Sequence, residues 1–108
     1  ENLQIPAEEI QNRINKTLTK LQIEELRYKE THTLSFGQKR LVTFASLLTL
    51  DPQVFLLDEI TAGLSQAYTD IIKTILQELK AEGKIIFLTD HSREFLKLAD
   101  QIIRLNFE

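Results

Sequence analysis

Two short apolar runs constrain the fold of this chain more than any other feature. Residues 54–57 read Val-Phe-Leu-Leu and residues 85–88 read Ile-Ile-Phe-Leu, and neither run alternates with polar residues. Such runs are too short for a helix and are typical of strands covered on both faces, as in parallel sheets. Between them, residues 66–82 carry apolar side chains at helical spacing, with Ser65 as a plausible cap. The order strand, helix, strand predicts a right-handed βαβ unit, and hence an α/β fold.

The chain after the second run continues the same alternation. Residues 92–98 predict a short helix with Phe95, Leu96 and Leu98 facing inward, and residues 101–106 predict a third short strand. From residue 51 onward, the sequence therefore predicts a βαβαβ half of a parallel sheet.

The first half of the chain predicts only helices. Pro6 suits the first position of a helix, where its missing N–H costs nothing. Apolar residues then recur on one helical face, at Ile10, Ile14, Leu18 and Leu21. A further helix begins after Ser35 and ends before Asp51-Pro52, because the residue before proline disfavours the helical conformation. We therefore place a boundary near residue 50, between a helical subdomain (1–50) and an α/β part (51–108).

The start of the second helix is a candidate binding site. Ser35 and Gln38 have the spacing of a capping box, in which each side chain bonds the backbone N–H of the other residue. A helix N-terminus also presents free N–H groups to a phosphate, and Gly37 would let a ligand approach the backbone closely. Alternatively, Ser35 and Gln38 do no more than cap the helix.

Polar residues follow both predicted strands. Asp58 and Glu59 close the first run, and Asp90 and His91 lie just beyond the second. Ligands of α/β sheets gather at the carboxyl ends of parallel strands, where these side chains are expected to approach one another. One carboxylate could hold Mg²⁺ while its neighbour polarises a water, and a histidine could contact a phosphate oxygen. The competing interpretation is a pair of solvent-facing acids and a surface histidine.

Several functions are disfavoured by the composition. The chain of 108 residues has no cysteine, which excludes disulfides and thiolate metal sites, and its net charge of −3 argues against nucleic acid as the main partner. No apolar run approaches the roughly 20 residues of a membrane span. The chain has three glycines and no G-x-x-x-x-G-K-[ST] motif, so these residues alone are not expected to hold a nucleotide.

Four motifs, in this order, resemble those of the ATP-binding subunits of ABC transporters. Residues 34–38, Leu-Ser-Phe-Gly-Gln, resemble the LSGGQ signature, and residues 54–59 resemble the Walker B strand with its catalytic glutamate. Residues 61–64 resemble the D-loop, and residues 89–91, Thr-Asp-His, resemble the switch-histidine segment. The resemblance implies a partial P-loop NTPase fold. The helical front is similar to the energy-coupling-factor and cobalt-importer branch.

The resemblance also implies roles for individual residues. Glu59 would be the general base for the hydrolytic water, His91 would contact the γ-phosphate, and Asp58 would support Mg²⁺, through water. The signature residues would meet ATP held by the opposite subunit of a head-to-tail dimer: Ser35, Phe36, Gly37 and Gln38. The implied partners are a second ATPase subunit and a transmembrane transporter subunit, at the cytoplasmic face of the membrane. The implied cargo is a vitamin or a metal ion.

The sequence departs from the family pattern at several positions. The Walker A loop and the Q-loop would lie upstream of Glu1, so we expect the chain to be a piece of a longer protein. Ile60 stands where proline is usual, Ser65 where aspartate is usual, and Leu41 where arginine is common. These changes fit either an active subunit or a degenerate half of an asymmetric pair. A non-transport ATPase of the same superfamily, or a noncatalytic interaction module, is the alternative. Strand edges and faces left without the upstream part should make this piece self-associate.

Overall fold

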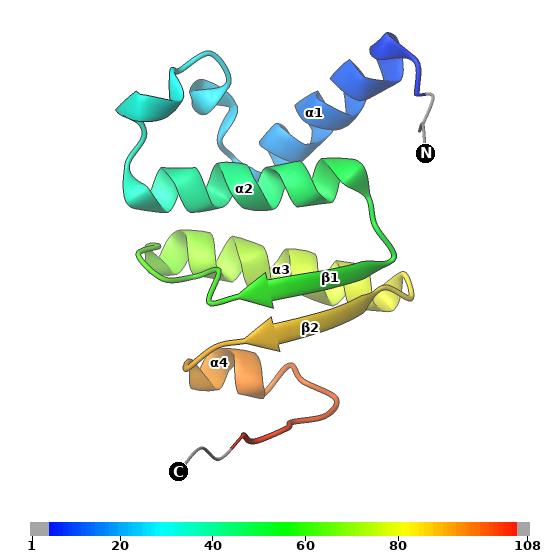
Figure 1. The fold of residues 1–108 in the computed structure, drawn as a ribbon, viewed down its shortest axis with the longest axis vertical. Helices are drawn as coiled ribbons and strands as arrows, with labels where there is room; N and C mark the ends of the chain where they lie inside the picture. Colours follow the sequence, from blue (N-terminus) through cyan, green and yellow to red (C-terminus); the bar gives the residue numbers. More distant parts are fainter. Residues whose placement is uncertain (1–4, 106–108) are drawn as a thin grey trace.

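The computed structural model describes residues 5–105. Helices precede the first strand, and the chain then alternates between strand and helix (Figure 1). The elements in chain order are α1 (Ala7–Leu21), the 3₁₀ turns η1 (Glu24–Leu26) and η2 (Thr31–Thr33), α2 (Phe36–Leu50), β1 (Val54–Asp58), α3 (Gln66–Ala81), β2 (Ile85–Thr89) and α4 (Arg93–Leu96). None of the described helices is long and apolar enough to cross a membrane.

The helical front is held by α1 packing on α2. The chain leaves α1 through Gln22, which has a positive φ of 59°, and Ile23 and Leu26 are then buried at 0% and 5% exposure. The prediction for the start of α1 was wrong by one residue, because Pro6 is the N-cap and not the first helical residue. Its ψ of 144° is extended, while its carbonyl oxygen accepts the first helical hydrogen bond from the Ile10 N–H at 3.1 Å.

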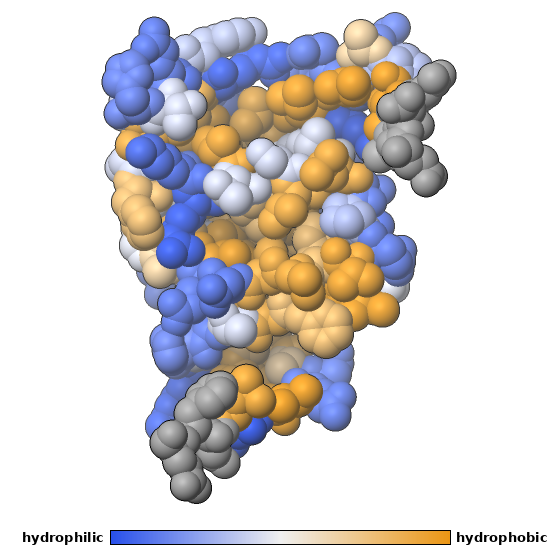
Figure 2. All heavy atoms as spheres, viewed as in Figure 1, coloured by the Kyte–Doolittle hydropathy of each residue, from blue (hydrophilic) through white to orange (hydrophobic). Residues whose placement is uncertain are grey.

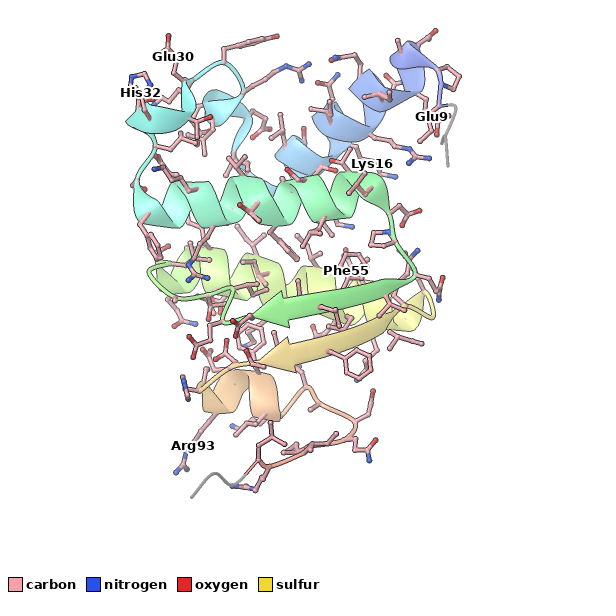
Figure 3. All side chains as sticks on the ribbon, in the orientation of Figure 1. Glu9, Lys16, Glu30, His32, Phe55 and Arg93 are labelled. Carbon is pink, nitrogen blue, oxygen red and sulfur yellow. The ribbon has the colours of Figure 1, made fainter. Side chains whose placement is uncertain are left out.

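Strands β1 and β2 form a parallel sheet, as predicted, with Val54 opposite Ile85 and Asp58 opposite Thr89. Helix α3 connects them and lies behind the sheet in the view of Figure 1. Phe55 and Leu57 are buried in a core shared with α2 and α3, at 1% and 4% exposure. Figure 3 shows where Phe55 lies on β1. This core also includes residues of the helical front, so one apolar cluster spans the boundary that we place near residue 50. That boundary stays a prediction.

The expectation that both faces of the strands are covered was wrong for the described residues. Leu56 and Phe87 are 74% and 58% exposed, and Val54 and Ile85 beside them are also exposed. Figure 2 shows these apolar side chains gathered across the middle of the molecule, over the two strands. The reason is that α2 and α3 pack on the residues that point the other way, while no described element lies over this face. We call Val54, Leu56, Ile85 and Phe87 the open sheet face.

The expected third strand was also wrong over the described residues. Residues 101–105 belong to no helix or strand, and Ile103 and Leu105 are 73% and 72% exposed. A strand exists only through hydrogen bonds to a neighbour, and the described sheet has two strands. Asn106, the last residue of that predicted strand, lies outside the described residues. Helix α4 is shorter than predicted, and Leu96 is 40% exposed instead of facing inward.

The open sheet face gives a direct test of the expected self-association. We expect Phe87→Lys to lower the average mass of the particles that the 108-residue chain forms in solution, measured by light scattering. The reason is that a charge on this face opposes apolar contact between copies. The matched control is Tyr28→Lys, which changes an 87% exposed aromatic side chain in the helical front. A monomeric unsubstituted chain at high concentration, or equal effects of both variants, would contradict the expectation.

Candidate functional site

The N-terminus of α2 has the predicted capping box. The Ser35 Oγ accepts from the Gln38 N–H at 3.1 Å, and the Gln38 Oε1 accepts from the Ser35 N–H at 2.9 Å. These bonds use one lone pair of the Ser35 hydroxyl and leave its O–H free to donate to another acceptor. The cap therefore leaves the hydroxyl able to bind a ligand.

Gly37 and Gly63 bring the start of α2 against the loop that follows β1. A Cβ atom on Gly37 would lie 2.9 Å from the Gly63 carbonyl oxygen, which is closer than real contacts allow. Gly63 itself has a φ of 80°, and a Cβ there would lie 3.1 Å from the Phe36 ring. The small size of Gly37 is therefore already used by the loop, whereas the sequence suggested that it would admit a ligand.

The carboxyl end of β1 holds the two predicted acids in different environments. Asp58 is exposed, and its Oδ1 accepts a hydrogen bond from the Thr89 hydroxyl on β2. Glu59 turns out of the strand with a φ of 48°, and its N–H donates to the Thr89 carbonyl oxygen at 2.9 Å. The two neighbouring acids therefore contact Thr89 in different ways, Asp58 through its carboxylate and Glu59 through its backbone N–H.

His91 and Glu59 lie side by side, as predicted from their positions after neighbouring strands. The His91 Nε2 is 2.6 Å from the Glu59 Oε1. The imidazole is 93% exposed and the Glu59 side chain is 44% exposed, so a ligand can reach both. A carboxylate next to an imidazole can take up a proton from a water while the ring contacts a negatively charged oxygen.

Asp90 ties the two loops of the site together. Its Oδ2 accepts from the Thr61 hydroxyl at 3.1 Å, and its Oδ1 accepts from the Ser92 N–H at 2.7 Å. The loop after β1 is thereby braced against the loop after β2. Sequence reasoning noted Asp90 and gave it no role, although its place between a strand end and His91 was a usable signal.

Sequence reasoning gave Arg40, which follows the signature residues, no role of its own. Its Nη1 donates to the Glu59 carbonyl oxygen at 2.6 Å, and its guanidinium carbon lies 4.8 Å from the centre of the Phe36 ring. No motif or spacing connects residues 40 and 59, so only the tertiary structure could reveal this contact.

Few side chains at this site could bind a metal ion. The described residues contain no group of three or more acidic or histidine side chains that could hold a metal. Mg²⁺ in nucleotide sites commonly takes one or two carboxylates, together with phosphate oxygens and waters. One exposed carboxylate at the end of β1, that of Asp58, fits this pattern.

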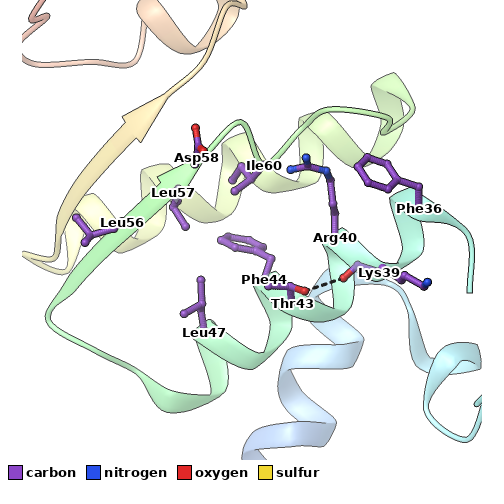
Figure 4. A pocket seen from close by; sticks show the side chains of 10 residues that line it. All are labelled: Phe36, Lys39, Arg40, Thr43, Phe44, Leu47, Leu56, Leu57, Asp58 and Ile60. Carbon is purple, nitrogen blue, oxygen red and sulfur yellow. Dashed lines mark hydrogen bonds between the residues drawn. The ribbon is translucent and has the colours of Figure 1, made fainter. Parts of the chain in front are cut away.

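A cavity of about 350 Å³ lies between α2 and β1, beside Asp58. Figure 4 shows that its walls come from one side of α2 and from the end of β1, and that Arg40 and Phe36 border it at the helix N-terminus. The lining is mostly apolar, and it includes Phe44, Leu56 and Ile60. The cavity therefore joins the open sheet face to the candidate site.

The sequence matches a family of known proteins. Residues 1–62 match the family model described as "ABC transporter". This chain belongs to that family. It is 38% identical over 98 residues to the energy-coupling factor transporter ATP-binding protein EcfA2 of Clostridium perfringens, covering 90% of this chain and 34% of that protein. It is 40% identical over 102 residues to the cobalt import ATP-binding protein CbiO of Rhodobacter capsulatus, covering 94% of this chain and 36% of that protein.

Solved structures of ABC ATP-binding proteins share the fold. The structure of cbiO1 from Clostridium perfringens, described as part of the ABC transporter complex cbiONQ, superimposes with a TM-score of 0.68 at 38% identity. That match covers 90% of this chain and 39% of the other. The predicted α/β class and partial P-loop NTPase fold are therefore confirmed, apart from the third strand. The chain spans about a third of the length of the relatives EcfA2 and CbiO, at 34% and 36%.

Proposed function

We propose that this chain is part of an ATP-binding and ATP-hydrolysing subunit of an ABC-type membrane importer. The observation that carries the proposal is the 2.6 Å contact between Glu59 and His91, at the edge of a parallel sheet in an ABC ATPase fold. The proposed cargo is a vitamin or a metal ion, and the relative named for cobalt import supports the metal ion. ATP and Mg²⁺ are the proposed cofactors.

In this proposal Glu59 removes a proton from the attacking water. Its Oε1 is engaged by His91, which leaves Oε2 to face the water. The exposed His91 ring contacts the terminal phosphate, and Asp58 holds Mg²⁺ through water. When bound there, Mg²⁺ would supply positive charge that offsets the negative charge of the transferred phosphoryl group.

The signature residues act on a nucleotide held by a second ATPase subunit. Ser35, Phe36, Gly37 and Gln38 form the first turn of α2 and its cap, in which Ser35 and Phe36 are exposed and Gly37 and Gln38 are half-buried. The N-terminal end of the helix dipole favours phosphate. Each site of the dimer is then composite. The movement that closes the dimer on ATP is transmitted through the helical subdomain to a transmembrane subunit. Because it contacts that subunit, the protein is peripheral, at the cytoplasmic face of the membrane.

A second candidate is a catalytically degenerate half of an asymmetric pair, and it is favoured by residues that have taken structural roles. Leu41, at the place where the family commonly has arginine, is 1% exposed in the core. Ser65, at the place of the D-loop aspartate, caps α3 by accepting from the Tyr68 N–H at 3.3 Å. This candidate keeps the fold and the dimer but has no turnover of its own.

The choice between transport and non-transport ATPases is tested by the partners of the full-length protein. Affinity purification from solubilised membranes is expected to recover a stoichiometric multi-span membrane protein together with an ATPase subunit. Recovery with DNA or ribosomes, and without a membrane protein, would overturn the transport assignment.

A further inference from the structure

Arg40 connects the first turns of α2 to the backbone of the candidate base. We propose that Arg40 is a positioning residue for Glu59, and this inference rests on the proposed function. The Arg40 Nη1 donates to the Glu59 carbonyl oxygen at 2.6 Å, across a sequence separation of 19 residues. Arg40 therefore contacts Glu59 through the main chain and not through the Glu59 carboxylate.

Glu59 needs such support because its backbone conformation is unfavourable. Its φ of 48° lies in the left-handed region, which residues other than glycine rarely adopt unless their surroundings hold them there. The Thr89 carbonyl oxygen fixes the Glu59 N–H, and Arg40 fixes the Glu59 carbonyl. The peptide groups on both sides of the Glu59 Cα are then held, which sets the direction of the side chain toward His91.

The guanidinium of Arg40 is itself held in place. It lies over the Phe36 ring, with 4.8 Å between its central carbon and the ring centre, and Phe36 in turn lies close to Gly63. The Arg40 Nε is buried and has no hydrogen-bond partner among the described residues. Since a buried unpaired donor is destabilising, stability alone is a poor explanation for an arginine here.

Arg40 also links the two halves of the proposed chemistry. Phe36 belongs to the first turn of α2, which meets the nucleotide of the opposite subunit, whereas Glu59 serves the nucleotide of its own subunit. A movement of the first turn on engaging ATP would reach Glu59 through the Phe36–Arg40 stack. This connection is separate from the D-loop position, where Ser65 only caps α3.

The test uses the full-length protein with Arg40→Met and Arg40→Lys. Arg40→Met removes the donor, so kcat for ATP hydrolysis is expected to fall roughly 10- to 100-fold with little change in KM, as for a displaced catalytic group. Arg40→Lys retains a charged donor and is expected to give an intermediate kcat. The control is Lys16→Met, which removes an exposed positive charge from α1 (Figure 3). Since Lys16 lies far from the loop that follows β1, this variant should leave kcat unchanged.

A double-mutant cycle with Glu59→Gln separates this role from a purely structural one. Single-turnover hydrolysis is measured for each variant alone and combined, and the effect of Arg40→Met is expected to vanish in the Glu59→Gln background. An undiminished effect there would overturn the proposal, since Arg40 would then act elsewhere. If Arg40→Met does not fold, the same cycle with Arg40→Lys applies the same criterion.

Failure of this inference is distinguishable from failure of the proposed function. Turnover at the wild-type rate in Glu59→Gln would remove Glu59 as the base and overturn both. Loss of turnover in Glu59→Gln, together with wild-type kcat in Arg40→Met, would overturn only the role of Arg40.

Discussion

Replacing Glu59 with glutamine in the full-length protein is expected to lower the rate of ATP hydrolysis by at least about 100-fold, the usual contribution of a general base. The amide keeps the shape of the side chain but cannot accept the proton of the attacking water. Binding of ATP should persist, because Glu59→Gln leaves the N-terminus of α2 and the carboxylate of Asp58 untouched. The subunits should therefore remain associated in ATP for longer than those of the wild-type protein.

Phosphate release and ATP-dependent association are the two measurements for Glu59→Gln. The matched control is Glu25→Gln, which makes the same change at an exposed position in η1. Hydrolysis at the wild-type rate in Glu59→Gln would exclude this residue as the base. Equal losses in both variants would show that the effect is not specific to the site.

The largest expected change in stability is that of Phe55→Ala. Phe55, labelled on β1 in Figure 3, is 1% exposed in the core cluster that it shares with residues of α2 and α3. Truncating a buried phenylalanine to alanine typically lowers the free energy of unfolding by about 3–5 kcal/mol, through lost burial and the cavity that remains. The position of Glu59 should change as well, because β1 ends at Asp58, the residue directly before Glu59.

The neighbouring residue provides the control for Phe55→Ala. Leu56 is 74% exposed on the opposite side of the same strand, so Leu56→Ala should change the free energy of unfolding by no more than about 0.5 kcal/mol. Both variants are compared by urea denaturation of the 108-residue chain, in the Phe87→Lys background to limit association. Equal losses would mean that the two faces of β1 are equally buried in solution, which would contradict the structure.

Local chemistry was predicted well where neighbours along the chain decide it. The capping box of Ser35 and Gln38 was readable because both partners lie within one helical turn. The end of α2 at Asp51-Pro52 was readable because proline restricts the residue before it. The approach of Glu59 to His91 was also predictable, since the carboxyl ends of adjacent parallel strands meet at one edge.

Contacts that depend on distant segments were not predictable. Residues 101–106 have the composition of a strand, yet residues 101–105 are unpaired, because pairing requires a neighbour that no local pattern specifies. The burial of β1 was overestimated for the same reason. An unbroken apolar run shows that both faces prefer cover, while only the fold decides whether a segment is present to provide it.

The sequence by itself determined the α/β class, the order of the α-helices and strands as far as α4, and the candidate residues Ser35, Asp58, Glu59 and His91. It could do so because helix caps, strand ends and the topology of a βαβ unit follow from short-range pattern. The tertiary structure alone decided that Arg40 holds the backbone of Glu59 and that Gly37 packs against Gly63. Such contacts join residues far apart in the chain, and their geometry is fixed only when α2 packs against the loop after β1.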